Sequence, residues 1–326
     1  MLLSIIIPQY KETDEIVKPL LGSIALQRGI DFNEIEVIIV NDGTDIKLCD
    51  CLCNRPYDIT YAFPKHLGVS GARQYGLDIA KGDYVMYCDA DDVFCNNLGL
   101  WYALVKMRRE RGDYDYCTST FYEEVKPVNS DELTYIMRGD VLQGSVDGIF
   151  IHGKIYRRQF LLDNNIKWKS QLTFNEDSYY NALCLKLSKK TVICDFPFYC
   201  WCWRNDSTVR QEDGYGLYSL PQLTDGIDLL TQEFIIRNFV KDACEGVCSH
   251  TYDMYYTMYD ERWQDKKYDK YKTVEQKRIR EFKNKWQFLY NNVTDERKIE
   301  LKEQSKNKIL KGLKVDTEPY ETWIGG

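Results

Sequence analysis

The chain has 326 residues, of which 44% are hydrophobic, 29% charged and 14% aromatic, so it can bury large cores and is not a disordered polypeptide. No apolar run approaches the roughly 20 residues of a membrane-spanning helix. The apolar start lacks a basic segment and meets Pro8, so we expect a strand there and not a signal peptide. Twelve cysteines without a secretory signal predict free thiols and a cytoplasmic location.

The net charge of −7 is unevenly distributed. Residues 262–314 contain 17 Lys and Arg against 8 Asp and Glu, a balance of +9, which leaves 26 basic and 42 acidic residues elsewhere, a balance of −16. An acidic body disfavours wrapping by nucleic acid and suits a site for divalent cations. The basic region allows peripheral contact with the inner face of a membrane. We favour a solvated helical cap, because charge runs usually face water.

Strand-like and helix-like segments alternate over the first 120 residues. Short β-branched or aromatic runs predict strands at 4–7, 36–40, 59–62 and 84–88. Longer periodic stretches predict helices at 15–27, 71–80 and 98–111. This alternation predicts an α/β fold with a mostly parallel sheet, helices on both faces, and ligands at the carboxyl ends of the strands.

The second part of the chain has a different pattern. Residues 116–216 are irregular, with short aromatic and polar segments, and helical spacing follows at 224–240, 273–290 and 294–310. Thr273 and Gln276 have the form of a capping box, which predicts a helix start. We therefore expect an α/β domain over 1–216, with halves 1–115 and 116–216, and a helical C-terminal extension over 217–326.

Two polar segments follow predicted strands. Segment 41–44 (NDGT) places a carboxylate where a base or ribose can bind, although a plain turn also fits these residues. Segment 89–92 (DADD) ends an apolar strand. Alternate side chains of an extended backbone share a face, so Asp89 and Asp91 can bind one divalent cation. A solvated acidic turn is the alternative.

A third segment, 65–73 (KHLGVSGAR), lies between these two. Its small residues let the backbone approach an anion, and the Arg73 guanidinium can contact phosphate. An ordinary first turn of a helix is the alternative. No GxGxxG segment opens a helix, which disfavours a dinucleotide-binding dehydrogenase.

In this order, the three segments resemble the family 2 inverting glycosyltransferases of the GT-A fold. The resemblance covers roughly residues 1–210. Its segments are PQYKE at 8–12, NDGT at 41–44, HLGVSGARQYG at 66–76, DADD at 89–92, GKIYRR at 153–158, NED at 175–177 and WRNDST at 203–208. The chain departs from the family pattern at Asn41, where the family has a carboxylate, at His66, where Asn is common, and near Arg204, where some relatives have a His.

The resemblance implies a GT-A-type, Rossmann-like sandwich that moves a sugar from a nucleoside diphosphate sugar, with UDP favoured, to an acceptor hydroxyl with inversion. It implies Asp177 as the general base, and Asp89 and Asp91 as ligands of Mn²⁺ or Mg²⁺. The implied donor-binding residues are Pro8, Tyr10, Glu12, Asn41, Asp42, Lys65, Gly68, Arg73, Asp89, Ala90, Asp91 and Arg204.

Three alternative functions stay open. One is a nucleotidyltransferase that uses the same carboxylate–metal site, and another is a phage-type glycosyltransferase acting on modified DNA bases. The third is a carbohydrate-binding module with a dead active site. The acceptor is also open: a glycan, a glycolipid or another hydroxyl-bearing molecule fits the sequence.

The cysteines and aromatic residues carry weaker signals. Cysteines at 49, 51 and 53 and at 200 and 202 are separated by single residues, whereas structural zinc sites usually have two-residue gaps. We therefore expect small buried thiols and no zinc site. The aromatic residues in 198–203 fit an acceptor platform and a packed core equally well.

Overall fold

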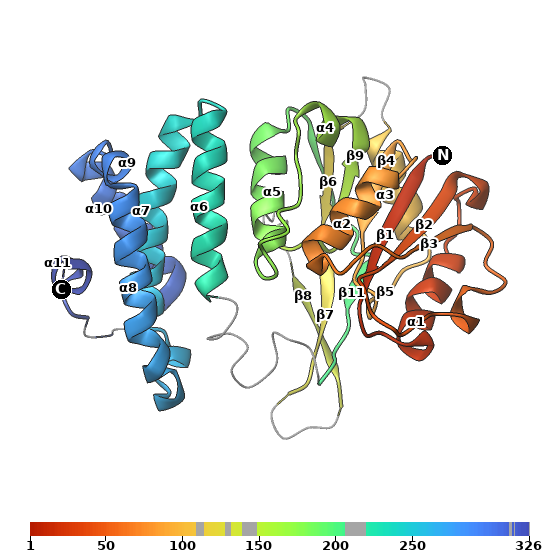
Figure 1. The fold of residues 1–326 in the computed structure, drawn as a ribbon, viewed down its shortest axis with the longest axis horizontal. Coiled ribbons are helices and arrows are strands. Elements are labelled where there is room, and N and C mark those ends of the chain that lie inside the picture. Colours follow the sequence, from red (N-terminus) through yellow and green to blue (C-terminus); the bar gives the residue numbers. More distant parts are fainter. Residues whose placement is uncertain are drawn as a thin grey trace. The chain divides into compact units, whose positions relative to one another are not determined.

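The computed structural model describes residues 1–108, 114–127, 132–138, 149–205, 220–312, 315 and 317–325. The chain forms two compact units, Met1–Asn205 and Asp206–Gly326. The first unit is an α/β domain, and the described part of the second is helical (Figure 1).

A mixed, mostly parallel sheet of seven strands is the centre of the first unit, with the order β10-β6-β9-β4-β1-β2-β3 (Figure 1). Its strands are β1 (Leu3–Gln9), β2 (Ile35–Asn41), β3 (Asp58–Ala62), β4 (Tyr84–Tyr87), β6 (Tyr116–Ser119), β9 (Ile155–Arg157) and β10 (Thr191–Cys194). Strand β9 runs antiparallel to its neighbours β4 and β6. Strands β1 and β2 are almost entirely buried, because helices cover both faces of the sheet.

The described residues of the first unit form the α-helices α1 (Asp14–Ala25), α2 (Gly68–Ile79), α3 (Gly99–Met107), α4 (Arg158–Asp163) and α5 (Glu176–Leu187). Alternate residues of β1 show that these helices cover both faces of the sheet. Leu3, Ile5 and Ile7 share one core with the apolar faces of α1 and α3. Ile6 points the other way, where its side chain meets Gly76 of α2. The predicted strands and the parallel sheet are confirmed.

A smaller sheet of four strands has the order β5-β11-β7-β8. Its strands are β5 (Val93–Phe94), β11 (Tyr199–Trp201), β7 (Phe121–Val125) and β8 (Thr134–Arg138). These strands have two to five residues. They explain the irregular pattern of 116–216, because such short runs show too few alternations to be recognised from sequence.

The second unit contains α6 (Leu220–Ile236), α7 (Val240–Thr257), α8 (Asp269–Lys285), α9 (Gln287–Asn291), α10 (Asp295–Leu310) and α11 (Tyr320–Gly325). Its core includes the fully buried Trp263 and Ile279. The helix start predicted at Thr273 is wrong, because α8 begins at Asp269 and the Gln276 amide donates to the Trp323 carbonyl instead, at 2.6 Å. Within the described residues, every helix is too short or too polar to span a bilayer.

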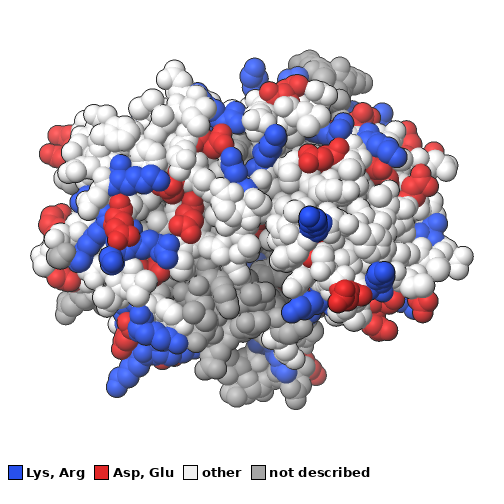
Figure 2. All heavy atoms as spheres, viewed as in Figure 1, with Lys and Arg blue, Asp and Glu red and all other residues white. Residues whose placement is uncertain are grey.

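Acidic side chains of α6 and α7 pair with part of the basic region. Arg and Lys residues of α8 and α10 form ion pairs with carboxylates of α6 and α7: Arg278 with Asp225, Lys285 with Asp228, Arg297 with Glu245, and Lys308 with Asp253. On the face drawn in Figure 2, blue and red side chains are interspersed. The charge of +9 in the sequence therefore does not form a uniform basic surface there.

Candidate active site

The carboxyl ends of β1, β2 and β4 meet at one edge of the large sheet. Gln9 and Asn41 are register partners, and the Asp42 amide donates to the Gln9 carbonyl at 2.7 Å. After β4, the Cys88 amide donates to the Ile6 carbonyl at 3.0 Å, and the chain continues directly into Asp89. Two predicted polar segments therefore lie together where an α/β sheet usually binds its ligand.

Arg73, on α2, joins this edge to α5. Its Nη2 donates to Asp89 Oδ1 at 2.8 Å and its Nη1 to Glu176 Oε1 at 2.7 Å. The guanidinium also lies 4.9 Å from the centre of the Trp168 ring, and only 4% of the side chain is exposed. Burial opposes ionisation of Asp89, but the Arg73 charge, the nearby His152 and the Arg73 hydrogen bond together outweigh it, so the pKa of Asp89 lies below its ordinary value.

Segment 89–92 is a turn and not an extended strand, since the Asp92 amide donates to the Asp89 carbonyl at 3.2 Å. The expectation that Asp89 and Asp91 share a strand face therefore rested on the wrong backbone geometry. Asp91 Oδ2 lies 3.2 Å from Arg204 Nη1, which is also 3.5 Å from Glu12 Oε1. Burial and the nearby Asp89 charge raise the pKa of Asp91 to about 6.

His152 is a site residue that the sequence reasoning missed. Its ring stacks on the rings of Tyr199 and Trp201, with centroids 5.2 and 5.5 Å away, and its Nδ1 lies 3.7 Å from Asp92 Oδ2. The possible ligand atoms of Asp89, Asp92 and His152 lie within 4.8 Å of one another. The only sequence signal was its place directly before segment 153–158.

These carboxylates fit a divalent cation. Asp92 is fully buried and accepts hydrogen bonds from the Tyr199 hydroxyl at 2.7 Å and the Cys202 amide at 2.9 Å. Burial and the charges of Asp89 and Asp91 raise the pKa of Asp92 well above its ordinary value. Crowded carboxylates that resist ionisation are stabilised by a cation, and oxygen and imidazole are suitable ligands for Mn²⁺.

Asp177 lies at the start of α5, next to Glu176. The helix begins at Glu176 after a left-handed Asn175 (φ 56°), so Asp177 is inside the first turn and is not the N-cap. Its Oδ1 accepts the Ser178 amide at 2.8 Å. Burial and the Glu176 charge raise the pKa of Asp177 to about 8, against the opposing charge of Arg73.

The loop after β2 encloses Asp42, whose Oδ1 accepts the Leu67 amide at 2.6 Å. His66 Nδ1 is 2.8 Å from the Asp42 carbonyl, and the His66 ring lies 5.2 Å from the Tyr10 ring. The side chain of His66 is 60% exposed and Tyr10 is 44% exposed, so the pair forms an accessible aromatic surface. Gly43 (φ 75°) is required here, because a Cβ would lie 2.7 Å from the His66 amide.

Asn41 serves the loop itself. Its Nδ2 donates to the Ile46 carbonyl at 2.9 Å and to the Tyr61 hydroxyl at 3.2 Å, and its Oδ1 accepts the Thr44 amide at 3.0 Å. These bonds use both ends of the buried side chain. Asn41 therefore holds the loop that presents Asp42.

The remaining predicted residues have simpler positions. Glu12 Oε2 accepts the amides of Tyr10 and Lys11 at 2.8 and 3.2 Å, which fixes the loop after β1. Gly68 begins α2 with a φ of 72°. Pro8 is half-buried within β1, Ala90 is buried in the turn, and Lys65 is exposed before α2.

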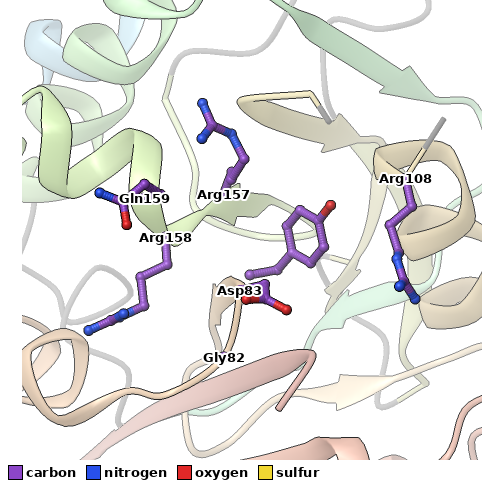
Figure 3. Close-up of a pocket in the computed structure, with 7 residues that line it drawn as sticks. Gly82, Asp83, Arg108, Arg157, Arg158 and Gln159 are labelled. Carbon is purple, nitrogen blue, oxygen red and sulfur yellow. The ribbon is translucent and has the colours of Figure 1, made fainter. Parts of the chain in front are cut away.

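A pocket of about 310 Å³ lies away from this site. It is lined by Gly82, Asp83, Tyr84, Arg108, Arg157, Arg158 and Gln159 (Figure 3). These residues include the start of β4, where the Tyr84 amide donates to the Leu2 carbonyl at 3.0 Å, so the pocket is at the opposite edge of the sheet. The three arginine side chains point away from one another in Figure 3, so they do not converge on a shared ligand.

A sequence comparison identifies the class of protein. The sequence profile of glycosyl transferase family 2 matches residues 4–170, which is half of the chain. The chain belongs to this family and is a glycosyltransferase.

Individual relatives are more distant. The chain is 23% identical over 219 residues to the uncharacterized glycosyltransferase EpsJ of Bacillus subtilis strain 168, a match that covers 61% of this chain and 60% of that protein. It is 24% identical over 211 residues to the uncharacterized glycosyltransferase YibD of Escherichia coli K12, covering 58% of this chain and 60% of that protein. The matched part is thus under two thirds of each relative.

Solved structures extend the likeness in fold to nearly the whole chain. S. aureus TarS 1–349 matches with a TM-score of 0.60 and 16% identity, over 97% of this chain and 93% of that chain. Its complex with UDP-GlcNAc matches with a TM-score of 0.54 and 18% identity, over 95% and 82% of the two chains. These matches confirm the predicted α/β fold with a helical C-terminal region.

Proposed function

We propose that the protein transfers a sugar from a UDP-sugar to an acceptor hydroxyl with inversion at the anomeric carbon. One observation carries the proposal: Arg73 contacts both Asp89, on the metal side of the site, and Glu176, next to Asp177. The buried Arg73 guanidinium therefore links Asp89, proposed to lie on the diphosphate side, to helix α5, proposed to lie on the acceptor side. An inverting transfer needs both sides at once, because departure of the diphosphate and attack by the hydroxyl are one displacement.

Asp177 is the proposed general base. Neither Arg73 nor Arg204 makes a direct ion pair with it among the contacts of the described residues, whereas Asp89, Asp91 and Glu176 all contact one of the two arginines. A pKa raised to about 8 also suits a carboxylate that must accept a proton near neutral pH. Its role is to take the proton of the acceptor hydroxyl.

A divalent cation, Mn²⁺ or Mg²⁺, is part of the proposal. Asp89 and Asp91 are the proposed ligands from the sequence, and the cluster of Asp89, Asp92 and His152 is a second donor set that shares Asp89. When bound, such a cation stabilises the negative charge of the leaving diphosphate. Arg204, beside Asp91, is placed to contribute positive charge to the same group.

UDP-GlcNAc is the first donor to test, because a TarS structure of similar fold is a complex with that sugar nucleotide. The exposed pair of Tyr10 and His66 can stack on the base, and the neighbouring Asp42 can bind the nucleoside. Lys65, just before α2, and Gly68, its first residue, are proposed to approach the phosphates. The acceptor is proposed only as a hydroxyl-bearing glycan, glycolipid or related molecule.

The proposal is tested by the nucleotide product and by metal removal. With UDP-GlcNAc, Mn²⁺ and an acceptor mixture, we expect UDP to accumulate, whereas pyrophosphate would indicate a nucleotidyltransferase. UDP should raise the melting temperature in Mn²⁺, since ligands stabilise the state they bind. Equal stabilisation by UDP in excess chelator would contradict the metal assignment.

A further inference from the structure

A cluster outside the proposed catalytic residues combines two cysteines with a carboxylate. Cys200, in β11, and Cys202, just after it, are two residues apart and can share one face of the strand. Strand β11 pairs in parallel with β7, with Cys200 beside Tyr122 and Trp201 beside Glu123. The same register brings Cys202 next to Glu124. The ligand atoms of Glu124, Cys200 and Cys202 all lie within 4.8 Å of one another.

We propose that Glu124, Cys200 and Cys202 bind a thiophilic divalent cation, for which Zn²⁺ is the probe. Zinc binds thiolates at about 2.3 Å and carboxylates at about 2.0 to 2.2 Å, so two sulfur ligands of one tetrahedral ion lie about 3.8 Å apart. The three ligand atoms lie within 4.8 Å of one another, so the three side chains are near enough to bind one ion. This proposal differs from the expectation of no zinc site, which considered only the single-residue spacing of the cysteines, because Glu124 lies on the neighbouring strand β7.

The surroundings of the cluster favour ordered ligands. Cys200 is buried, and Cys202 Sγ lies 3.8 Å from the Cys200 carbonyl. The two oxygens of Glu124 accept the Trp203 amide at 2.8 Å and the Tyr135 hydroxyl at 3.1 Å, which orients the carboxylate. Such outer contacts usually support metal ligands. Three protein ligands leave a fourth position for water, so the ion is exchangeable.

The cluster is directly linked to the candidate active site. The Cys202 amide donates to Asp92 Oδ1 at 2.9 Å, and Arg204, two residues later, contacts Asp91. A cation that fixes Cys202 against Glu124 therefore restrains the segment that delivers Arg204. The binding site itself does not depend on the proposed function, whereas this effect on the donor side does.

Co²⁺ titration of the chelator-treated, reduced protein tests the site, because cobalt bound to thiolates has a charge-transfer absorption that cobalt on Asp and His lacks. We expect this absorption in the wild type, its loss in Cys200→Ser and Cys202→Ser, and at least a ten-fold weaker competition for Zn²⁺ in Glu124→Gln. The matched control is Cys49→Ser with Cys53→Ser, two exposed cysteines elsewhere, which should leave binding unchanged.

Three results would overturn the proposal. They are cobalt binding without the thiolate absorption in the wild type, the same loss in the Cys49 and Cys53 control, and a Cys200–Cys202 disulfide that persists in reductant. If the serine variants do not fold, Glu124→Gln decides, and unchanged zinc affinity in that variant counts against the site. UDP release assayed in parallel separates this proposal from the function, since zinc binding can be present when transfer is absent.

Discussion

Arg73 is a buried cation whose two partners come from distant parts of the chain. Asp89 follows β4 and Glu176 begins α5, and each accepts one arm of the guanidinium. A buried charge is tolerated only when it is paired and hydrogen-bonded, so the three residues form one unit. At this scale, stability and proposed catalysis depend on the same contacts.

Replacing Arg73 tests this unit. We expect Arg73→Met to lower the free energy of unfolding by about 2 to 4 kcal/mol, because it leaves two carboxylates without their cation. The loss is below that of a fully enclosed pair, since 32% of the Asp89 side chain is exposed. Urea unfolding measures it. Lys277→Met, which removes an exposed ion pair, should cause no measurable change.

Asp177 is tested by Asp177→Asn, which keeps the size of the side chain but cannot accept a proton. We expect the transfer rate to fall by about 10² to 10⁴, the usual contribution of a positioned base, with normal folding and UDP binding. Steady-state kinetics measures the transfer rate, and thermal shifts with UDP measure folding and UDP binding. Asp195→Asn, an exposed carboxylate, is the control. Wild-type turnover in Asp177→Asn would require another base.

At the scale of elements, long apolar runs were predictable and short ones were not. Strands β1, β2 and β4 are mostly apolar segments, so their existence and their shared edge followed from the sequence. Strands β5 and β11 have two and three residues and depend on pairing with distant segments. The proximity of His152 and Asp92 was also not predicted. It depends on a turn and a second sheet that bring distant segments together.

Helix α7 carries a titratable group that gives its unit a pH response. The buried His250 ring lies 5.1 Å from the Phe282 ring, and its Nε2 is 3.1 Å from Thr224 Oγ1 on α6. Burial lowers the pKa of His250 to about 4 from an ordinary 6.5. Below pH 6.5 His250 is therefore protonated in the unfolded chain but stays neutral in the folded chain, so the free energy of unfolding falls as the pH decreases.

We expect this group to remove about 3 kcal/mol of stability between pH 6.5 and pH 4, since each pKa unit corresponds to about 1.4 kcal/mol. The variant His250→Gln keeps a polar contact for Thr224 but does not titrate. Its stability should decline less steeply over this range than that of the wild type. Parallel slopes in denaturant unfolding at several pH values would contradict the assignment.

At the scale of the molecule, the chain combines a family 2 glycosyltransferase unit with a helical unit. The match in fold to TarS 1–349 covers 97% of the chain and therefore includes the helical unit. The sequence predicted the α/β fold of the first unit and the helical character of the second. It could not show that the basic residues of α8 and α10 find their counter-charges on α6 and α7. That pairing depends on how the helices pack.

These ion pairs bear on membrane binding. Because four basic side chains of α8 and α10 are paired with carboxylates of α6 and α7, the helical unit has less unpaired positive charge to attract anionic lipid. We expect the protein to remain at the bottom of a flotation gradient with phosphatidylserine vesicles at low salt. Co-migration with these vesicles, but not with neutral ones, would show that the basic region binds the membrane surface.

The contact between Arg73 and Glu176 also determines when the candidate site can form during protein synthesis. The two residues are separated by 103 positions, and a ribosome adds about 5 to 20 residues per second. Arg73 therefore leaves the ribosome roughly 5 to 20 seconds before its partner. During that interval β1, β2 and β4 can assemble, but the edge proposed to bind the donor lacks the Glu176 carboxylate that pairs with Arg73. The nascent chain thus completes this edge late, after β1, β2 and β4 have left the ribosome.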